Sequence, residues 1–168
     1  MPTYVPDCEH DILVSYAHDN NEPLAEDSDG WITTLVRNLK QRLNIKIGRG
    51  KYDLWIDDKL AGNIPLDDQI MGAIDNTAVL LLVLSPAYLR SEWCKKEKGA
   101  FLKTIKKEAF RAKARVFVIE YDDTGDIRPS ELNGLNGYIF WAKKENTDVT
   151  FTFNDPAVPE SKDLYYGK

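Results

Sequence analysis

Glu97 is the residue whose type and spacing most clearly suggest chemistry. It follows Trp93 by four residues and precedes Phe101 by four, so the three share one stripe of the helix that the apolar spacing predicts over 92–110. A carboxylate on an aromatic stripe costs free energy unless a cation or a ligand compensates it. Two interpretations stay open, namely an ion pair with one of the neighbouring lysines and a catalytic carboxylate.

Further candidates lie where the predicted strands end, because open α/β sheets bind ligands outside the carboxyl ends of their strands. The loop 57–65 follows a predicted strand at 52–56, and Ser85 follows the wholly apolar strand 78–84. The candidates at the end of the first predicted strand, 11–16, are Ser15, Tyr16, Ala17, His18 and Asp19. We expect these three loops to meet at one edge of a sheet.

The elements that must position these residues alternate along the chain. Two further strands are predicted at 115–120 and 138–141, and the helices are expected at 31–43, 66–74, 92–110 and 130–135. Ser28 and Asp29 are expected to cap the first helix. A strand without polar positions, such as 78–84, must be covered on both faces. The pattern therefore predicts an α/β fold, a doubly wound five-stranded parallel sheet with helices on both faces.

Composition places the chain among single-domain globular proteins. Its 168 residues are 43% hydrophobic and 29% charged, and the formal net charge of −5 argues against a nucleic-acid partner. Cys8 and Cys94 form no CxxC unit, and the two histidines, His10 and His18, make no credible metal site. Since no signal peptide and no apolar run of membrane length is found, we expect a cytoplasmic protein without membrane contact.

Charge is distributed unevenly along the chain. Residues 1–30 hold eight acidic side chains and no Lys or Arg, whereas 95–115 are crowded with basic ones. This asymmetry suggests head-to-tail association of copies, although ordinary solvated helix faces give the same pattern more often.

Three stretches resemble Toll/interleukin receptor (TIR) domains, over about residues 9–141. They are Asp-Ile-Leu-Val-Ser-Tyr at 11–16, Leu-Trp-Ile-Asp at 54–57, and the segment 84–97. The third contains Ser-Pro-x-Tyr followed by Ser-x-Trp-Cys-x-x-Glu, which is similar to plant and bacterial members and is the most specific match. The resemblance implies a flavodoxin-like sheet with strand order 2-1-3-4-5.

In the bacterial NAD-cleaving type, the resemblance implies an NAD+ nucleosidase in which Glu97 promotes loss of nicotinamide from ribose. The products would be nicotinamide and ADP-ribose or a cyclic ADP-ribose, with NAD+ as the substrate and no cofactor. One carboxylate suffices for this reaction because nicotinamide leaves as a neutral pyridine and needs no proton. Ordinary glycosidases need two carboxyls because their alcohol leaving group must be protonated.

The resemblance also implies which residues contact NAD+. Trp93 would form a wall beside the nicotinamide ribose, although an aromatic residue on a helix is also typical of a core. Some active relatives carry an acidic residue and an aromatic where this chain has Leu60 and Ile64. The expected contacts are Ser15, Tyr16, Ala17, His18, Asp19, Leu60, Gly62, Asn63, Ile64, Ser85 and Trp93.

Other functions fit the sequence less well. The turn 48–51 lacks the preceding glycine of a phosphate-binding loop, and Ser15 has no fixed partners that would make it a nucleophile. A phosphate-accepting receiver domain needs an aspartate at the end of the third strand, where this chain has Leu84-Ser85-Pro86. The main alternative is a non-catalytic TIR module that assembles with other TIR domains in signalling.

The last part of the chain, 142–168, is expected to be a polar tail that leads into a final helix. Residues 1–168 are therefore taken as one TIR domain at the N-terminal end of a longer protein. The resemblance implies activation by head-to-tail self-association, a C-terminal sensor domain, and a role in bacterial antiviral defence or immune-type signalling.

Overall fold

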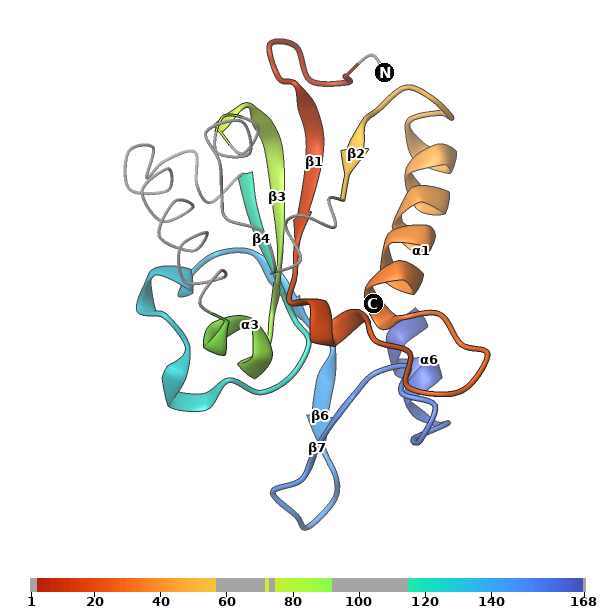
Figure 1. The fold of residues 1–168 in the computed structure, drawn as a ribbon, viewed down its shortest axis with the longest axis vertical. Helices are drawn as coiled ribbons and strands as arrows, with labels where there is room; N and C mark the ends of the chain where they lie inside the picture. The colour runs from red at the N-terminus through yellow and green to blue at the C-terminus, as the bar shows by residue number, and fades with distance from the viewer. Residues whose placement is uncertain (1–2, 57–71, 73–74, 92–114, 168) are drawn as a thin grey trace.

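The centre of the fold is a five-stranded parallel sheet with the order β2-β1-β3-β4-β5 (Figure 1), which confirms the predicted fold class. The computed structural model describes residues 3–56, 72, 75–91 and 115–167. The predicted helix at 66–74, apart from Gly72, and the helix at 92–110 lie outside the described residues. The strands are β1 His10–Ser15, β2 Leu54–Trp55, β3 Thr77–Leu84, β4 Val116–Glu120 and β5 Gly137–Ile139.

The apolar strand β3 occupies the middle of the sheet, as its composition predicts. It pairs in parallel with β1, where Ile12 faces Val79, and with β4, where Leu80 faces Val116. Its side chains alternate between two apolar clusters, because successive residues of a strand point to opposite faces. Burial on both faces explains why β3 carries no polar side chain after Thr77.

One face of the sheet packs against the short helix α3 Pro86–Arg90 and the 3-10 turn η4 Ser130–Leu132. The fully buried side chains of Tyr88 and Leu132 contribute to this cluster together with Leu84. The helical stretch expected at 130–135 is therefore a single 3-10 turn, which begins after Pro129.

The other face is covered by α1 Trp31–Lys46 and by the C-terminal helix α6 Ser161–Tyr166. The helix expected at 31–43 is confirmed, but the capping role expected for Ser28 and Asp29 is wrong. The Ser28 hydroxyl donates to the Ala25 carbonyl at 2.7 Å, and Asp29 pairs with Arg37 at 2.5 Å. Gly30 is the N-cap instead, and a Cβ added there would lie 1.9 Å from the backbone oxygen of Asn21.

The strand expected at 138–141 is divided between two sheets. β5 ends at Ile139, and after Phe140 the chain continues as β6 Trp141–Lys143, which pairs antiparallel with β7 Thr150–Thr152. The physical reason is the buried Phe140, whose N–H donates to the Glu120 carbonyl and whose own carbonyl accepts from Phe153. The resulting hairpin projects beyond the sheet (Figure 1).

An aromatic cluster around Trp31 joins the C-terminal segment to the sheet. The Trp31 indole donates from Nε1 to the Phe153 carbonyl at 2.8 Å and meets Phe140 and Tyr165 edge-on, with ring centroids 5.6 and 6.0 Å apart. The helix expected near the end of the sequence is α6, and its Tyr165 is buried. The segment after residue 141, expected as a polar tail, thus completes one side of the core.

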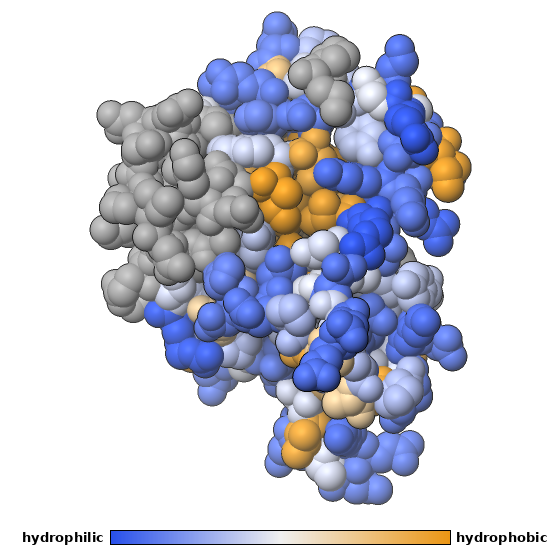
Figure 2. Space-filling view, turned by 45° about the vertical axis from the view of Figure 1, so that its right-hand side comes forward, coloured by the Kyte–Doolittle hydropathy of each residue, from blue (hydrophilic) through white to orange (hydrophobic). Residues whose placement is uncertain are grey.

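Burial on the α1 side is more complete toward the carboxyl ends of the strands. Val14, Val83 and Ile119 are buried there, whereas Ile12 and Leu81, nearer the amino ends, are only partly buried. Figure 2 shows hydrophobic side chains at the surface in the upper half of the molecule, with hydrophilic residues on their right-hand side. No helix in the described ranges combines the length and the apolar composition needed to cross a bilayer.

Burial of tyrosine hydroxyls predicts a loss of stability at alkaline pH. Burial raises the pKa of Tyr165, against the opposing effect of its hydrogen bond from Asn38, and burial together with the charge of Asp155 raises the pKa of Tyr121. Well below pH 10 these groups are neutral in both the folded and the unfolded state. Above pH 10 the unfolded chain releases its protons first, so the free energy of unfolding must fall as pH rises.

We expect urea denaturation to show a smaller drop between pH 8 and pH 10.5 for Tyr165→Phe than for the parent chain. The comparison removes the contribution of lysines, which both chains share. Tyr138→Phe is the control, because Tyr138 is 56% exposed. An identical drop in Tyr165→Phe and the parent would show that the Tyr165 hydroxyl has no such role.

Candidate functional site

The candidate residues that the structure describes gather at the carboxyl edge of the sheet, where β1 and β3 end. Ser15 is the last residue of β1 and lies opposite Leu82 of β3, two residues before β3 ends at Leu84. The 3-10 turn η1 His18–Asn21 and α3 follow these strands and lie at the same end of the sheet (Figure 1). This is the edge at which parallel α/β sheets bind ligands.

Buried hydrogen bonds connect the two segments at this edge. The Ser85 hydroxyl donates to Oδ1 of Asn20 at 2.6 Å and accepts from the Tyr88 N–H at 3.0 Å. The hydroxyls of Ser15 and Tyr88 lie 3.1 Å apart. We call these four residues the buried polar cluster. Because Ser15 and Ser85 are each 1% exposed, their hydroxyls serve the interior of the protein in this structure.

Tyr16 and Ala17 alternate between the two faces of the sheet as β1 ends. Tyr16 is buried in the cluster beneath α1, and Ala17 is buried in the cluster that contains Tyr88. Their side chains therefore fix the direction in which the chain leaves the strand. The backbone carbonyl of Ala17 accepts from the Asn20 N–H at 3.0 Å, which closes the turn η1.

His18 and Asp19 are the candidates that the structure places at the surface. Nε2 of His18 lies 3.0 Å from a carboxylate oxygen of Glu22, with side chains 56% and 62% exposed. Such an exposed pair contributes little to stability. Asp19 is also exposed. Both side chains are thus free to face solvent or a ligand at the carboxyl edge.

A second anchor holds the same loop to the start of α1. Oδ1 of Asn21 accepts from the Thr33 N–H at 2.9 Å, and its Nδ2 donates to the Thr33 hydroxyl at 3.1 Å. The close approach of Asn21 to Gly30 leaves no room for a side chain at that glycine. The turn η1 is therefore attached on one side to β3 and α3 and on the other side to α1.

Six candidates lie outside the described residues, so the structure tests neither their positions nor their roles. They are Leu60, Gly62, Asn63, Ile64, Trp93 and Glu97. The described chain approaches the last two through α3, which ends at Arg90 with Ser91 as its C-cap. Among the candidate residues, the structure thus describes Ser15–Asp19 and Ser85.

Two residues of this edge, Asn20 and Tyr88, are not among the candidates that the sequence predicts. Tyr88 is part of the Ser-Pro-x-Tyr pattern, and a buried tyrosine hydroxyl usually has a hydrogen-bond partner, so a polar contact was predictable. Asn20 lies in an acidic, Asn-rich loop that resembles a solvated segment. No pattern in the sequence distinguishes the buried Asn20 from the neighbouring Asn21.

The carboxyl end of β4 carries a further paired carboxylate. One oxygen of Glu120 lies 2.5 Å from Arg128, and the other accepts from Nε1 of Trp141 at 3.3 Å. Both oxygens are thus engaged by protein groups. Across the described part of the chain, no three His, Cys, Asp or Glu side chains are grouped so that they could hold a metal ion.

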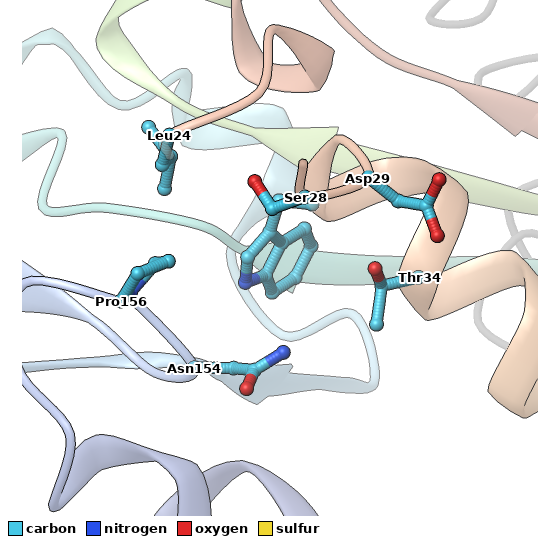
Figure 3. Close-up of a pocket in the computed structure, with 7 residues that line it drawn as sticks. Leu24, Ser28, Asp29, Thr34, Asn154 and Pro156 are labelled. Atoms are coloured by element: carbon cyan, nitrogen blue, oxygen red, sulfur yellow. The ribbon is translucent and has the colours of Figure 1, made fainter. Parts of the chain in front are cut away.

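A pocket of about 180 Å³ lies near the start of α1, between the loop before that helix and the segment after β7 (Figure 3). Ligand pockets commonly measure about 300–1,000 Å³, so this one is too small to enclose a dinucleotide. It includes none of the candidate residues. Its lining residues are Leu24, Ser28, Asp29, Trp31, Thr34, Asn154 and Pro156.

Comparison with known proteins identifies the family. The model of the TIR domain family matches residues 12–151, so this chain belongs to that family. The match includes four of the five strands from their first residue onward and reaches β7. The expectation drawn from the segments at 11–16, 54–57 and 84–97 is confirmed at this level.

Two known proteins illustrate the similarity. The chain is 27% identical over 143 residues to Protein toll of Drosophila melanogaster, an alignment that covers 80% of this chain and 11% of that protein. The fold is similar to a TIR-STING receptor from C. gigas solved in complex with 2′,3′-cGAMP, with a TM-score of 0.52 and 20% identity. That match covers 83% of this chain and 38% of the receptor chain, so this chain spans a minor part of both relatives.

Proposed function

We propose that this TIR domain cleaves NAD+ between nicotinamide and ribose, with Glu97 as the catalytic residue. The observation that carries the proposal is the sequence 84–97, in which Ser-Pro-x-Tyr is followed by Ser-x-Trp-Cys-x-x-Glu. The described geometry supports it in one respect. Ser85 directly follows β3 at the carboxyl edge of the sheet and caps α3 by accepting from the Tyr88 N–H, so this segment starts at the edge where parallel α/β sheets bind ligands.

The proposed reaction breaks the bond between the anomeric carbon and the pyridinium nitrogen. The bonding electron pair goes to that nitrogen, so nicotinamide leaves neutral, and positive charge develops on the ribose. The Glu97 carboxylate stabilises this charge, as a fixed group of opposite sign does in a site that excludes water. Water then adds to the anomeric carbon and loses a proton, which gives ADP-ribose, or an adenine nitrogen adds and gives a cyclic product.

The residues assigned to binding divide into two groups. His18 and Asp19 are exposed at the carboxyl edge, where an imidazole N–H can donate to a phosphate and a carboxylate can accept from ribose hydroxyls. Trp93 and the loop residues Leu60, Gly62, Asn63 and Ile64 are assigned from the sequence alone. Ser15, Tyr16, Ala17 and Ser85 are buried, and we assign them to shaping the edge from within.

The reaction class is tested by incubating the chain with NAD+ and separating the products by chromatography. Nicotinamide appearing in equal amounts with ADP-ribose or cyclic ADP-ribose supports the proposal, and the ratio of the two identifies the second step. If NAD+ is recovered intact from a chain that is folded and self-associates, the proposed enzymatic function is wrong. The alternative, a non-catalytic TIR module that assembles with other TIR domains, then stands.

Self-association is expected to control the activity. Head-to-tail contacts between unlike surfaces can propagate and can complete a site with a neighbour's loop. Residues 1–30 carry eight acidic side chains and no Lys or Arg, and 95–115 are rich in Lys and Arg. Specific activity is therefore expected to rise with protein concentration and to fall with salt, because exposed charges are screened within about 8 Å at physiological ionic strength. Specific activity that stays constant over both ranges would show that each chain acts alone.

The biological setting of the proposal is bacterial antiviral defence or immune-type signalling in the cytoplasm. A sensor domain after residue 168 would bring the TIR domains together, and depletion of NAD+ would stop the host cell. Nicotinamide release by the longer protein only after exposure to its trigger would support this arrangement.

A further inference from the structure

We propose that Asn20 is a positioning residue, and that its hydrogen bond from Ser85 makes the turn η1 and the start of α3 move as one unit. The inference rests on the proposed function in assigning the purpose of this unit, which is to hold His18 and Asp19 against the end of β3 for NAD+ binding. The coupling of the two segments is a property of the fold and can be measured without substrate.

The hydrogen bond between Ser85 and Asn20 is buried. Ser85 is 1% exposed and Asn20 is 8% exposed, so water has little access to either polar group. A buried hydroxyl that loses its acceptor pays a desolvation penalty that an exposed one avoids. The bond from Ser85 to Asn20, at 2.6 Å, joins residues 65 positions apart in the chain. It therefore links the loops that follow two neighbouring strands, β1 and β3, beyond the last backbone pairing between those strands.

The Ser85 hydroxyl has a defined direction because it is engaged twice. Its hydrogen points to Oδ1 of Asn20, and its lone pair accepts from the Tyr88 N–H. The Tyr88 hydroxyl in turn lies 3.1 Å from the Ser15 hydroxyl at the end of β1. Buried polar groups linked in this way stiffen a structure when every member is satisfied. The chain of contacts runs from β1 through α3 to η1.

His18 and Asp19 immediately precede Asn20 in the same turn. Neither is buried, and the only ion pair described for His18 is the exposed one with Glu22, so neither has a buried side-chain anchor of its own in the described structure. The buried Asn20 is consequently the side chain that ties their positions to β3. Its loss is expected to weaken binding more than turnover, because Asn20 does not touch the reacting atoms.

The neighbouring Asn21 provides a matched control. It is the same residue type in the same turn, but its hydrogen bonds go to Thr33 of α1. Asn21→Ala is expected to loosen the turn on the α1 side and leave α3 unchanged. Asn20→Ala is expected to loosen the turn and α3 together.

The experiment compares Asn20→Ala, Asn20→Asp, Ser85→Ala and Asn21→Ala with the parent chain. Hydrogen exchange by mass spectrometry follows peptides that cover 16–22 and 86–91. We expect Asn20→Ala and Ser85→Ala to speed exchange in both peptides, whereas Asn21→Ala affects only the first. Asn20→Asp keeps an acceptor for Ser85 and is expected to restore much of the protection of α3, which also covers the case that Asn20→Ala fails to fold.

The role in NAD+ binding is tested by measuring KM and kcat for NAD+ separately in each variant. For Asn20→Ala we expect KM to rise about tenfold with kcat within about twofold of the parent, the pattern of lost uniform binding. The Asn20→Ala and Ser85→Ala effects on KM should be less than additive in the double variant, since both remove one contact.

Two results would overturn the inference. One is faster exchange in 16–22 of Asn20→Ala with α3 unchanged, and the other is an equal effect of Asn21→Ala on α3. An unchanged KM with the exchange result intact would remove only the assignment to NAD+ binding. A parent chain that leaves NAD+ intact refutes the proposed function instead, and the exchange experiment then decides the coupling alone.

Discussion

Replacing Glu97 by Gln is expected to lower kcat for NAD+ cleavage about 100-fold or more while the chain stays folded. The substitution keeps the size and shape of the side chain, removes its charge and replaces one acceptor oxygen by an NH2 donor. Removing one fixed electrostatic stabiliser of a transition state typically costs about 100- to 1,000-fold in kcat. Nicotinamide release under saturating NAD+, with circular dichroism of both chains, measures the effect.

Glu145→Gln is the control for this substitution. Glu145 is exposed in the turn between β6 and β7, so its loss changes the net charge by the same amount without touching the site. We expect it to retain the parent rate. Near-normal cleavage by Glu97→Gln would refute the assignment of Glu97, and an equal loss in both variants would attribute the effect to net charge.

Replacing Trp31 by Ala is expected to lower the free energy of unfolding by about 3–5 kcal/mol, the usual cost of removing a large aromatic side chain from a core. Trp31 is 3% exposed and lies at the centre of the aromatic cluster. Its indole also donates to the Phe153 carbonyl, so the substitution removes a buried hydrogen bond as well. Urea denaturation followed by circular dichroism gives the value.

Two companion variants separate the contributions. Trp31→Phe keeps a ring but loses the donor to Phe153, and it is expected to be intermediate. Tyr138→Ala removes an aromatic side chain that is 56% exposed and is expected to cost little. If Trp31→Ala is as mild as Tyr138→Ala, the packing of the C-terminal segment on α1 does not stabilise the fold as described.

Periodicity predicts the parts of the fold whose burial is repetitive. The run 78–84 has no polar position, a pattern typical of a strand that is covered on both faces. The structure places β3 there, in the middle of the sheet. The apolar spacing from Trp31 onward predicts α1, because its buried residues recur at helical intervals along one face. The strand order followed from the resemblance, since spacing along one chain does not determine which strands pair.

The parts that the sequence does not predict depend on single long-range contacts. The separation of β5 from β6 follows from Phe140 entering the aromatic cluster, where Phe153 and Tyr165 come from much later in the chain. Asn20 is buried because Ser85 is near it in space, and no local pattern records that. The helix caps expected at Ser28 and Asp29 fail for a different reason, because nearby groups in the chain, the Ala25 carbonyl and Arg37, engage those side chains.

The most direct test of the central claim is the time course of nicotinamide release from NAD+ by the parent chain at the highest protein concentration that stays in solution. We expect release that is linear in time, matched by the appearance of ADP-ribose or its cyclic form, and faster per chain than at low concentration. Absence of nicotinamide at every concentration, from a chain that is folded and self-associates, would contradict it.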